Sequence, residues 1–198
     1  MYTIKDEVVT SYMIMKSEFI THLKPVKSVE EAKEYFAIMK EKYADATHNI
    51  TAYVVGKTGE AGHYSDDGEP SGTAGLPVLD VFRKNEITNF ACVVTRYFGG
   101  IKLGAGGLVR AYSSAASQAL KEAIVVPIIE YTKIQITFNY SYLDIIENKL
   151  KNYEITSKEF SSNVSMVLNI PKTDVNTVIN ILVNLTNNMI QIKTYEEK

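Results

Sequence analysis

The spacing of apolar residues along the first two thirds of the chain predicts alternating strands and helices. Ser28 and Glu31 form a capping box, and apolar residues then recur at helical spacing as far as Tyr43, so we expect an amphipathic helix over 29–43. Small residues on one face of 108–123 predict a helix that packs closely on a sheet. The first 26 residues are predicted as two strands, with a break between them near Lys16-Ser17. A strand at 51–55 with a hairpin partner near 63–64, a helix over 75–83 and a buried strand at 89–95 are expected to follow.

The pattern changes after Pro127, and this change predicts a second domain. Apolar residues alternate with polar ones in 134–138 and 164–170, which indicates half-buried strands. The expected order is a strand at 134–138, a helix carrying Leu143, Ile146 and Leu150, strands at 153–160 and 164–170, a helix opened by Pro171 that carries 175–185, and a strand at 190–192. This βαββαβ order is the ferredoxin-like pattern. We therefore expect an α+β protein with domains at 1–126 and 127–198, the second being a scaffold or interaction module.

Composition is typical of a soluble globular protein, with 45% hydrophobic and 22% charged residues. The single cysteine, Cys92, excludes an internal disulfide. The N-terminus lacks the basic-then-apolar pattern of a signal peptide, and no apolar run approaches the ~20 residues of a spanning helix, so we expect a cytoplasmic protein without a membrane partner. The net charge of −2 argues against a generally basic nucleic-acid coat protein but leaves room for a local basic patch.

All 11 glycines of the chain lie between Gly56 and Gly107. Glycine allows close approach to the backbone but weakens helices and strands, so its confinement to one window marks a specialised segment. Within residues 58–80 there are acidic residues and no Lys or Arg, whereas 87–121 has basic residues and no Asp or Glu. If the two halves meet in space, the functional surface is a cleft with charges of both signs.

The basic half has the layout of an anion-binding site. Residues 89–123 are predicted as a strand, a glycine loop and a helix, which places free backbone N–H groups and the positive helix end beside the loop. Arg96, Lys102 and Arg110 add positive charge. The segment therefore predicts phosphate binding.

The glycines match neither standard nucleotide motif. A P-loop requires Lys and Ser or Thr after the glycine, and Ala105 follows Gly104. A dinucleotide loop requires glycine three residues after Gly106, where Val109 stands. The plainer interpretation is that the glycines only shape tight turns and helix–sheet packing.

The acidic half offers three carboxylates, from Asp66, Asp67 and Glu69, beside the hydroxyls of Ser65 and Ser71. Hard oxygen ligands of this kind can hold magnesium together with waters, which makes magnesium a candidate cofactor. The alternatives are a solvated hairpin turn, or acids that orient the basic loop through ion pairs.

His48 and the aromatic pair after Arg96 each have two interpretations. His48 precedes a predicted strand and is either a general base or a hydrogen-bonded structural histidine. Tyr97 and Phe98 either stack on nucleobases, as in single-strand binders, or belong to the core.

These segments together resemble the signature of the YigZ/IMPACT family, and the resemblance covers most of residues 1–125. The motifs that carry it are Asp-Ala-Thr-His-Asn at 45–49, Ser-Asp-Asp-Gly-Glu-Pro-Ser-Gly-Thr-Ala-Gly at 65–75, Thr-Arg-Tyr-Phe-Gly-Gly-Ile-Lys-Leu-Gly at 95–104 and Gly-Gly-Leu-Val-Arg-Ala-Tyr at 106–112. The remainder is similar to the small second domain of the bacterial members.

The resemblance implies a first domain of the ribosomal-protein/elongation-factor domain IV type, a ferredoxin-like second domain and a role near translation. Eukaryotic IMPACT proteins restrain the kinase that answers amino-acid starvation. Because the IMPACT motifs begin within 50 residues of Met1, we do not expect that function to transfer directly.

The leading hypothesis is a non-enzymatic RNA- or ribosome-binding protein linked to translation regulation, with no catalytic residue. The alternatives are a magnesium-dependent enzyme acting on a small phosphorylated or acidic substrate, with His48 moving protons, and a protein-interaction module with a protein partner. The candidate cleft residues are His48, Asp66, Asp67, Glu69, Ser71, Thr73, Arg96, Tyr97, Lys102, Gly104, Gly106 and Arg110.

Overall fold

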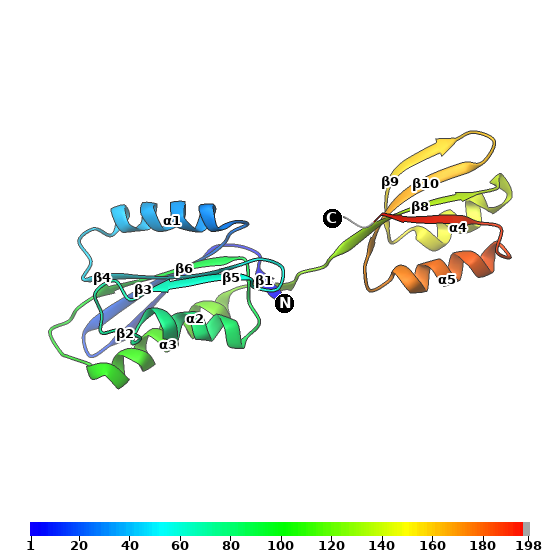
Figure 1. The fold of residues 1–198 in the computed structure, drawn as a ribbon. Coiled ribbons are helices and arrows are strands. Elements are labelled where there is room, and N and C mark those ends of the chain that lie inside the picture. The colour runs from blue at the N-terminus through cyan, green and yellow to red at the C-terminus, as the bar shows by residue number, and fades with distance from the viewer. Residues whose placement is uncertain (196–198) are drawn as a thin grey trace. The chain divides into compact units, whose positions relative to one another are not determined.

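The computed structural model describes residues 1–195, which form two compact units, Met1–Ile128 and a second unit from Ile129 onward (Figure 1). Both units mix helices and strands, so the protein is of the α+β class, as predicted. The elements of the first unit are β1 (Tyr2–Ile4), β2 (Val8–Ile14), β3 (Ser17–Pro25), α1 (Val29–Lys42), β4 (His48–Val55), β5 (Ala61–Ser65), α2 (Gly75–Lys84), β6 (Phe90–Tyr97), α3 (Gly104–Glu122) and β7 (Val125–Pro127).

A five-stranded antiparallel sheet in the order β2-β3-β6-β4-β5 forms the centre of the first unit. The central strand β6 is buried along almost its whole length, which explains its continuous apolar sequence. The short strands β1 and β7 pair separately.

Helices cover both faces of this sheet (Figure 1). Successive residues of a strand point to opposite faces, so Ala91 and Val93 of β6 pack with α1 while Cys92 and Val94 pack with α2 and α3. Ala111, Ala115, Ala116 and Ala119 of α3 are fully buried against the sheet, which is the close packing predicted from these small residues.

The second unit is a four-stranded antiparallel sheet in the order β11-β8-β10-β9 with two helices. Its buried core joins alternate residues of β8 and β10 to α4 and α5, so both helices lie on one face. Its elements are β8 (Tyr131–Phe138), the 3-10 turn η1 (Tyr140–Tyr142), α4 (Leu143–Leu150), β9 (Glu154–Phe160), β10 (Val164–Pro171), α5 (Val175–Leu185) and β11 (Gln191–Tyr195). This is the predicted βαββαβ order.

Two features of the first unit differ from the prediction. The first 26 residues hold three strands instead of two, because β1 is completed by a partner about 120 residues away in the chain. Helix α3 begins at Gly104 and not at residue 108, so its first turn contains the glycines that were assigned to a loop. No helix in the described part of the chain is long and apolar enough to cross a membrane.

Candidate functional site

The site is built from two segments that follow strands of the first unit. We call residues 65–75 the acidic loop and residues 98–104 the glycine loop. The acidic loop joins β5 to α2, and the glycine loop joins β6 to α3 at the end of the sheet (Figure 1). Strands β4 and β6 are neighbours in the sheet. The Asp-Ala-Thr-His-Asn motif at 45–49 therefore lies beside the end of β6, where the glycine loop begins.

Asp66 organises the acidic loop from within. Its carboxylate accepts hydrogen bonds from the backbone N–H groups of Gly72 at 2.7 Å, Ala74 at 3.1 Å and Gly75 at 2.8 Å. Gly75 is the first residue of α2, and its N-cap residue, Ala74, supplies no side-chain hydrogen bond. Asp66 therefore caps α2 from eight or nine residues upstream, where a negative charge also suits the helix dipole.

Asp67 fastens the acidic loop to the start of β4. The Asp67 carboxylate accepts a hydrogen bond from the Asn49 N–H at 2.6 Å. The Asp67 carbonyl oxygen lies 2.7 Å from His48 Nδ1. Since a carbonyl only accepts hydrogen bonds, Nδ1 of His48 carries the proton.

Glu69 is buried and forms an ion pair with the buried Arg96. Its Oε1 accepts a hydrogen bond from Arg96 Nη1 at 2.5 Å and another from the Tyr112 hydroxyl at 2.8 Å. This interaction ties the acidic loop to β6 and to α3. Burial raises the pKa of the Tyr112 phenol, and the neighbouring Glu69 carboxylate raises it further.

The Arg96 guanidinium lies between two aromatic rings. It is 5.4 Å from the ring centroids of both Phe19 and Phe98, within the range of cation–π attraction. Its Nη2 is 3.5 Å from the Ser17 hydroxyl, and Nε has no hydrogen-bond partner among the described residues. The structure therefore places Arg96 inside the unit, where its side chain is 6% exposed, and not on the surface.

His48 lies at the edge of this cluster. Its Nε2 is 3.9 Å from Glu69 Oε2, and its side chain is 20% exposed. A Cβ at Gly68 would lie 3.5 Å from the imidazole ring, so the loop backbone covers one side of it. His48 is thus hydrogen-bonded, as one of its two interpretations expects.

The motif residues 45–49 support the end of β6. Asp45 accepts a hydrogen bond from the Tyr97 hydroxyl at 3.0 Å, and the Thr47 hydroxyl accepts one from the Phe98 N–H at 3.0 Å. These bonds fix the chain where the glycine loop begins. Tyr97 is thus anchored at its hydroxyl, whereas Phe98 is 43% exposed.

Gly99 allows the glycine loop to pack against the β2–β3 turn. A Cβ at Gly99 would overlap the backbone carbonyl of Lys16, so only glycine fits there. The Gly99 N–H donates to the Ser17 hydroxyl at 3.2 Å. Gly100 and Gly104 have positive φ and open space around them.

The outer surface of the loop and the first turns of α3 carry unpaired positive charge. Lys102 and Arg110 are exposed, and neither has an ion-pair partner within residues 1–195. Arg110 Nη1 would lie 3.9 Å from a Cβ at Gly106, so its guanidinium sits over the first turn of α3. The N-cap residue Leu103 supplies no side-chain hydrogen bond, which leaves the N–H groups of this turn available.

The predicted residues thus separate into an interior and an exposed group. In the interior group Glu69, Thr73 and Arg96 are buried, whereas His48, Asp66, Asp67 and Tyr97 are partly buried. The Thr73 hydroxyl donates to the Pro70 carbonyl at 2.6 Å. The exposed group contains Ser71, Lys102, Gly104, Gly106 and Arg110.

The three acidic side chains are directed to different partners. Asp66 and Asp67 accept bonds from backbone N–H groups, and Glu69 from Arg96 and Tyr112. Within residues 1–195, no three or more His, Cys, Asp or Glu side chains gather as a metal site would require. We therefore derive no role for magnesium.

Tyr112 is a site residue that the sequence pattern missed. It is fully buried and meets both Glu69 and the ring of Phe19, the latter at 5.0 Å between centroids. The sequence feature that could have identified it is a tyrosine in a helix segment, 111–116, that otherwise consists of alanine and serine. Such a residue needs a partner for its hydroxyl.

Two family models match the chain. The Impact N-terminal domain matches residues 15–120, and a domain of unknown function, DUF1949, matches residues 136–188. The first match covers more than half of the chain, and it contains both loops of the site. The chain belongs to the IMPACT family.

Individual relatives agree with this assignment. The chain is 39% identical to the IMPACT family member YvyE of Bacillus subtilis, covering 100% of this chain and 94% of that protein. It is 41% identical to the IMPACT family member YigZ of Escherichia coli over 60% of this chain and 61% of that one. It is 37% identical to Protein IMPACT of Rattus norvegicus, over 45% of this chain and 29% of the rat protein. A solved crystal structure of a hypothetical protein is similar with a TM-score of 0.65 and 31% identity, covering 100% of this chain and 98% of that one.

Proposed function

We propose that the chain is a cytoplasmic, non-enzymatic RNA- or ribosome-binding protein that acts in translation regulation. The observation that carries this proposal is the exposed surface formed by the glycine loop and the first turns of α3. There Lys102 and Arg110 are unpaired among the described residues, and the helix N–H groups lack a side-chain cap. The link to translation is supported by membership of the IMPACT family.

This surface suits a phosphate of an RNA backbone. Lysine and arginine contact phosphates directly, and backbone N–H groups at a helix start add directed donors. Gly100 and Gly104 leave the backbone uncovered, so a phosphate can approach the main chain there. The half-exposed ring of Phe98 offers a surface on which an unpaired base stacks.

In this proposal Arg96 positions the surface and does not contact phosphate. Its guanidinium is held by Glu69 and lies against Phe98, the first residue of the glycine loop. Glu69 also holds Tyr112 on α3. The buried group therefore fixes both ends of the glycine loop, and Lys102 and Arg110 make the contacts.

We also assign the first unit to the ribosomal-protein/elongation-factor domain IV type and the second to the ferredoxin-like type. The βαββαβ order and the antiparallel strand order β11-β8-β10-β9 support the second assignment. The first is supported by the match to the Impact N-terminal domain. Both types occur in proteins of the translation apparatus, according to the family resemblance.

Sucrose-gradient sedimentation of a lysate at low and high salt tests the proposal. We expect the wild type in the ribosomal fractions at low salt, released at high salt, and Lys102→Ala/Arg110→Ala at the top of the gradient. The matched control is Lys84→Ala/Lys121→Ala, which removes two exposed charges from the last turns of α2 and α3. The control should sediment like the wild type.

Two outcomes contradict the proposal. If wild type and both variants remain at the top, the chain does not bind ribosomes under these conditions. If the protein stays in a large complex after nuclease treatment, a protein partner holds it, which favours an interaction module.

A further inference from the structure

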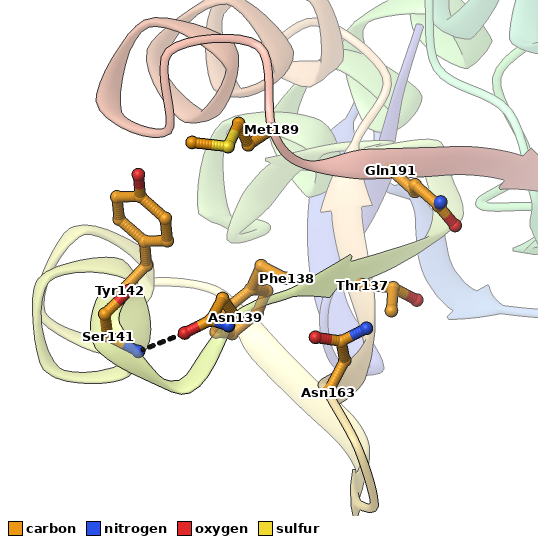
Figure 2. A pocket seen from close by; sticks show the side chains of 8 residues that line it. All are labelled: Thr137, Phe138, Asn139, Ser141, Tyr142, Asn163, Met189 and Gln191. Atoms are coloured by element: carbon orange, nitrogen blue, oxygen red, sulfur yellow. Dashed lines mark hydrogen bonds between the residues drawn. The ribbon is translucent and has the colours of Figure 1, made fainter.

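The second unit has a pocket of about 340 Å³ where β8 leads into α4 (Figure 2). Its size lies within the range of small-ligand sites. Phe138, at the end of β8, lies between an apolar side and a polar side of the pocket (Figure 2). Nothing in the function proposed above uses it.

The polar side presents neutral hydrogen-bonding groups from separate segments. Thr137 of β8 lies directly opposite Gln191 at the start of β11, and Asn163 precedes β10. The carboxamides of Asn163 and Gln191 are exposed and have no hydrogen-bond partner among the described residues. Each can donate and accept at the same time.

Tyr142 and Met189 supply the apolar surface on the other side, where Asn139 and Ser141 also line the pocket. Figure 2 shows the tyrosine ring and the thioether on the same side of Phe138, across from Asn163 and Gln191. Met189 is 67% exposed although it is apolar, so it presents an uncovered surface for a ligand to contact. Methionine sulfur packs favourably on aromatic rings.

The lining contains no charged side chain. A phosphate, a carboxylate or a cation would gain no charge-assisted contact there. A flat neutral ligand with an apolar face and an edge of mixed donors and acceptors fits both sides. A nucleobase has these properties: carboxamides pair with base edges in a bidentate manner, and aromatic side chains stack on base faces.

A second aromatic surface lies beside the pocket. Tyr140 and Phe160 stack with ring centroids 6.3 Å apart, and both are about half exposed. The Tyr140 hydroxyl donates to the Ser161 carbonyl at 2.8 Å, which fixes the ring next to the turn that carries Asn163. A neighbouring base of a single strand can stack on this pair.

We propose that this pocket binds one unpaired nucleobase of a single-stranded RNA. The inference rests on the proposed RNA-binding function and adds to it a site for the base, separate from the phosphate contacts of the first unit. Asn163 and Gln191 bind the base edge, and Tyr142 and Met189 contact its face.

The test is an NMR titration of the full chain with the four ribonucleosides, which carry no phosphate. We expect shifts of the Asn163 and Gln191 side-chain amides and of the Met189 methyl group. Asn163→Ala/Gln191→Ala should weaken binding about tenfold, since each loses a hydrogen bond to the base. The matched control, Asn148→Ala/Asn180→Ala, removes two exposed amides from α4 and α5 outside the pocket and should bind like the wild type.

The outcomes separate this inference from the proposed function. Absence of nucleoside shifts at the pocket overturns the inference, and salt-dependent RNA binding lost in Lys102→Ala/Arg110→Ala would still support the proposed function. Equal or stronger shifts with glucose or N-acetylalanine amide also overturn it, because the pocket would then recognise a sugar or a peptide. Nucleoside binding that persists in Lys102→Ala/Arg110→Ala and is lost in Asn163→Ala/Gln191→Ala supports it.

Discussion

At the scale of single residues, the site depends on a buried ion pair more than on its exposed charges. Glu69 and Arg96 are almost fully buried, and each neutralises the other. A buried ion pair adds little stability compared with apolar residues in the same place, but removing one partner leaves the other charge buried and unpaired. Their role here is to fix the acidic loop, β6 and α3 relative to one another.

Glu69→Gln should therefore lower the free energy of unfolding by about 3–5 kcal/mol, because the Arg96 guanidinium stays buried without its carboxylate. Tyr112→Phe, which removes only the hydroxyl bond to Glu69, should cost about 1 kcal/mol. Urea denaturation measures both changes in the free energy of unfolding.

The double variant Glu69→Gln/Arg96→Met should lose less free energy of unfolding than Glu69→Gln alone. A loss equal to the sum of the losses in the two single variants would contradict a coupled pair.

His22 gives the unit a pH dependence outside the site. Burial lowers the pKa of His22, and the nearby Lys42 ammonium lowers it further against the opposing effect of Glu7. Below the unfolded value of about 6.5 the unfolded chain gains a proton that the folded chain does not bind, so stability falls as the pH drops. We expect thermal unfolding to shift to lower temperature between about pH 7.5 and pH 5, and His22→Gln to show a smaller shift. An equal shift in the variant would assign the effect to other groups.

At the scale of elements, the glycine loop shows why glycine is required at one position for space and at another for backbone angle. A side chain at Gly99 meets the Lys16 carbonyl, whereas Gly100 has open space but φ of +85°. A side chain at Gly99 must therefore displace the loop, whereas one at Gly100 adds only local backbone strain.

Gly99→Ala should thus weaken RNA binding more than Gly100→Ala does. The strain at Gly100 costs about 1 kcal/mol of stability without moving Lys102 or Arg110 away from the loop. Fluorescence anisotropy with a labelled single-stranded RNA compares the two, each checked for folding by circular dichroism. Stronger impairment by Gly100→Ala would contradict the packing argument.

The sequence predicted most elements because their apolar periods are local. The period of α1 and the alternation of β10 each depend on neighbouring residues only. The pairing of β1 with β7 was missed because its two strands are separated by most of the first unit. The start of α3 was missed because glycine disfavours helices, while here it opens one.

The glycine and charge pattern predicted the residues of the candidate site, but it did not predict which of them are buried. Arg96 and Lys102 look alike in sequence, and only the packing of β6 against the acidic loop makes the first an interior residue. Likewise Asp66 looks like a metal ligand until its three N–H donors are known.

At the scale of the whole molecule, the net charge of −2 is unfavourable for binding RNA. Under the proposed function, affinity must therefore come from a local surface, and the glycine loop with the first turns of α3 is such a surface, because residues 98–110 contain no acidic side chain. Electrostatic contacts of this kind release counterions from the nucleic acid and make binding depend on salt. The number of phosphate contacts can be measured from that dependence.

The most direct test of the central claim is the affinity of the full chain for a single-stranded RNA between about 50 and 200 mM salt. We expect the log–log salt slope of the wild type to fall by about 1.4 in Lys102→Ala/Arg110→Ala, which is about 0.7 for each lost phosphate contact on a single strand. Lys84→Ala/Lys121→Ala should keep the wild-type slope. A slope that is unchanged in Lys102→Ala/Arg110→Ala, or binding of the wild type that ignores salt, would contradict the assignment of the glycine loop as the phosphate-binding surface.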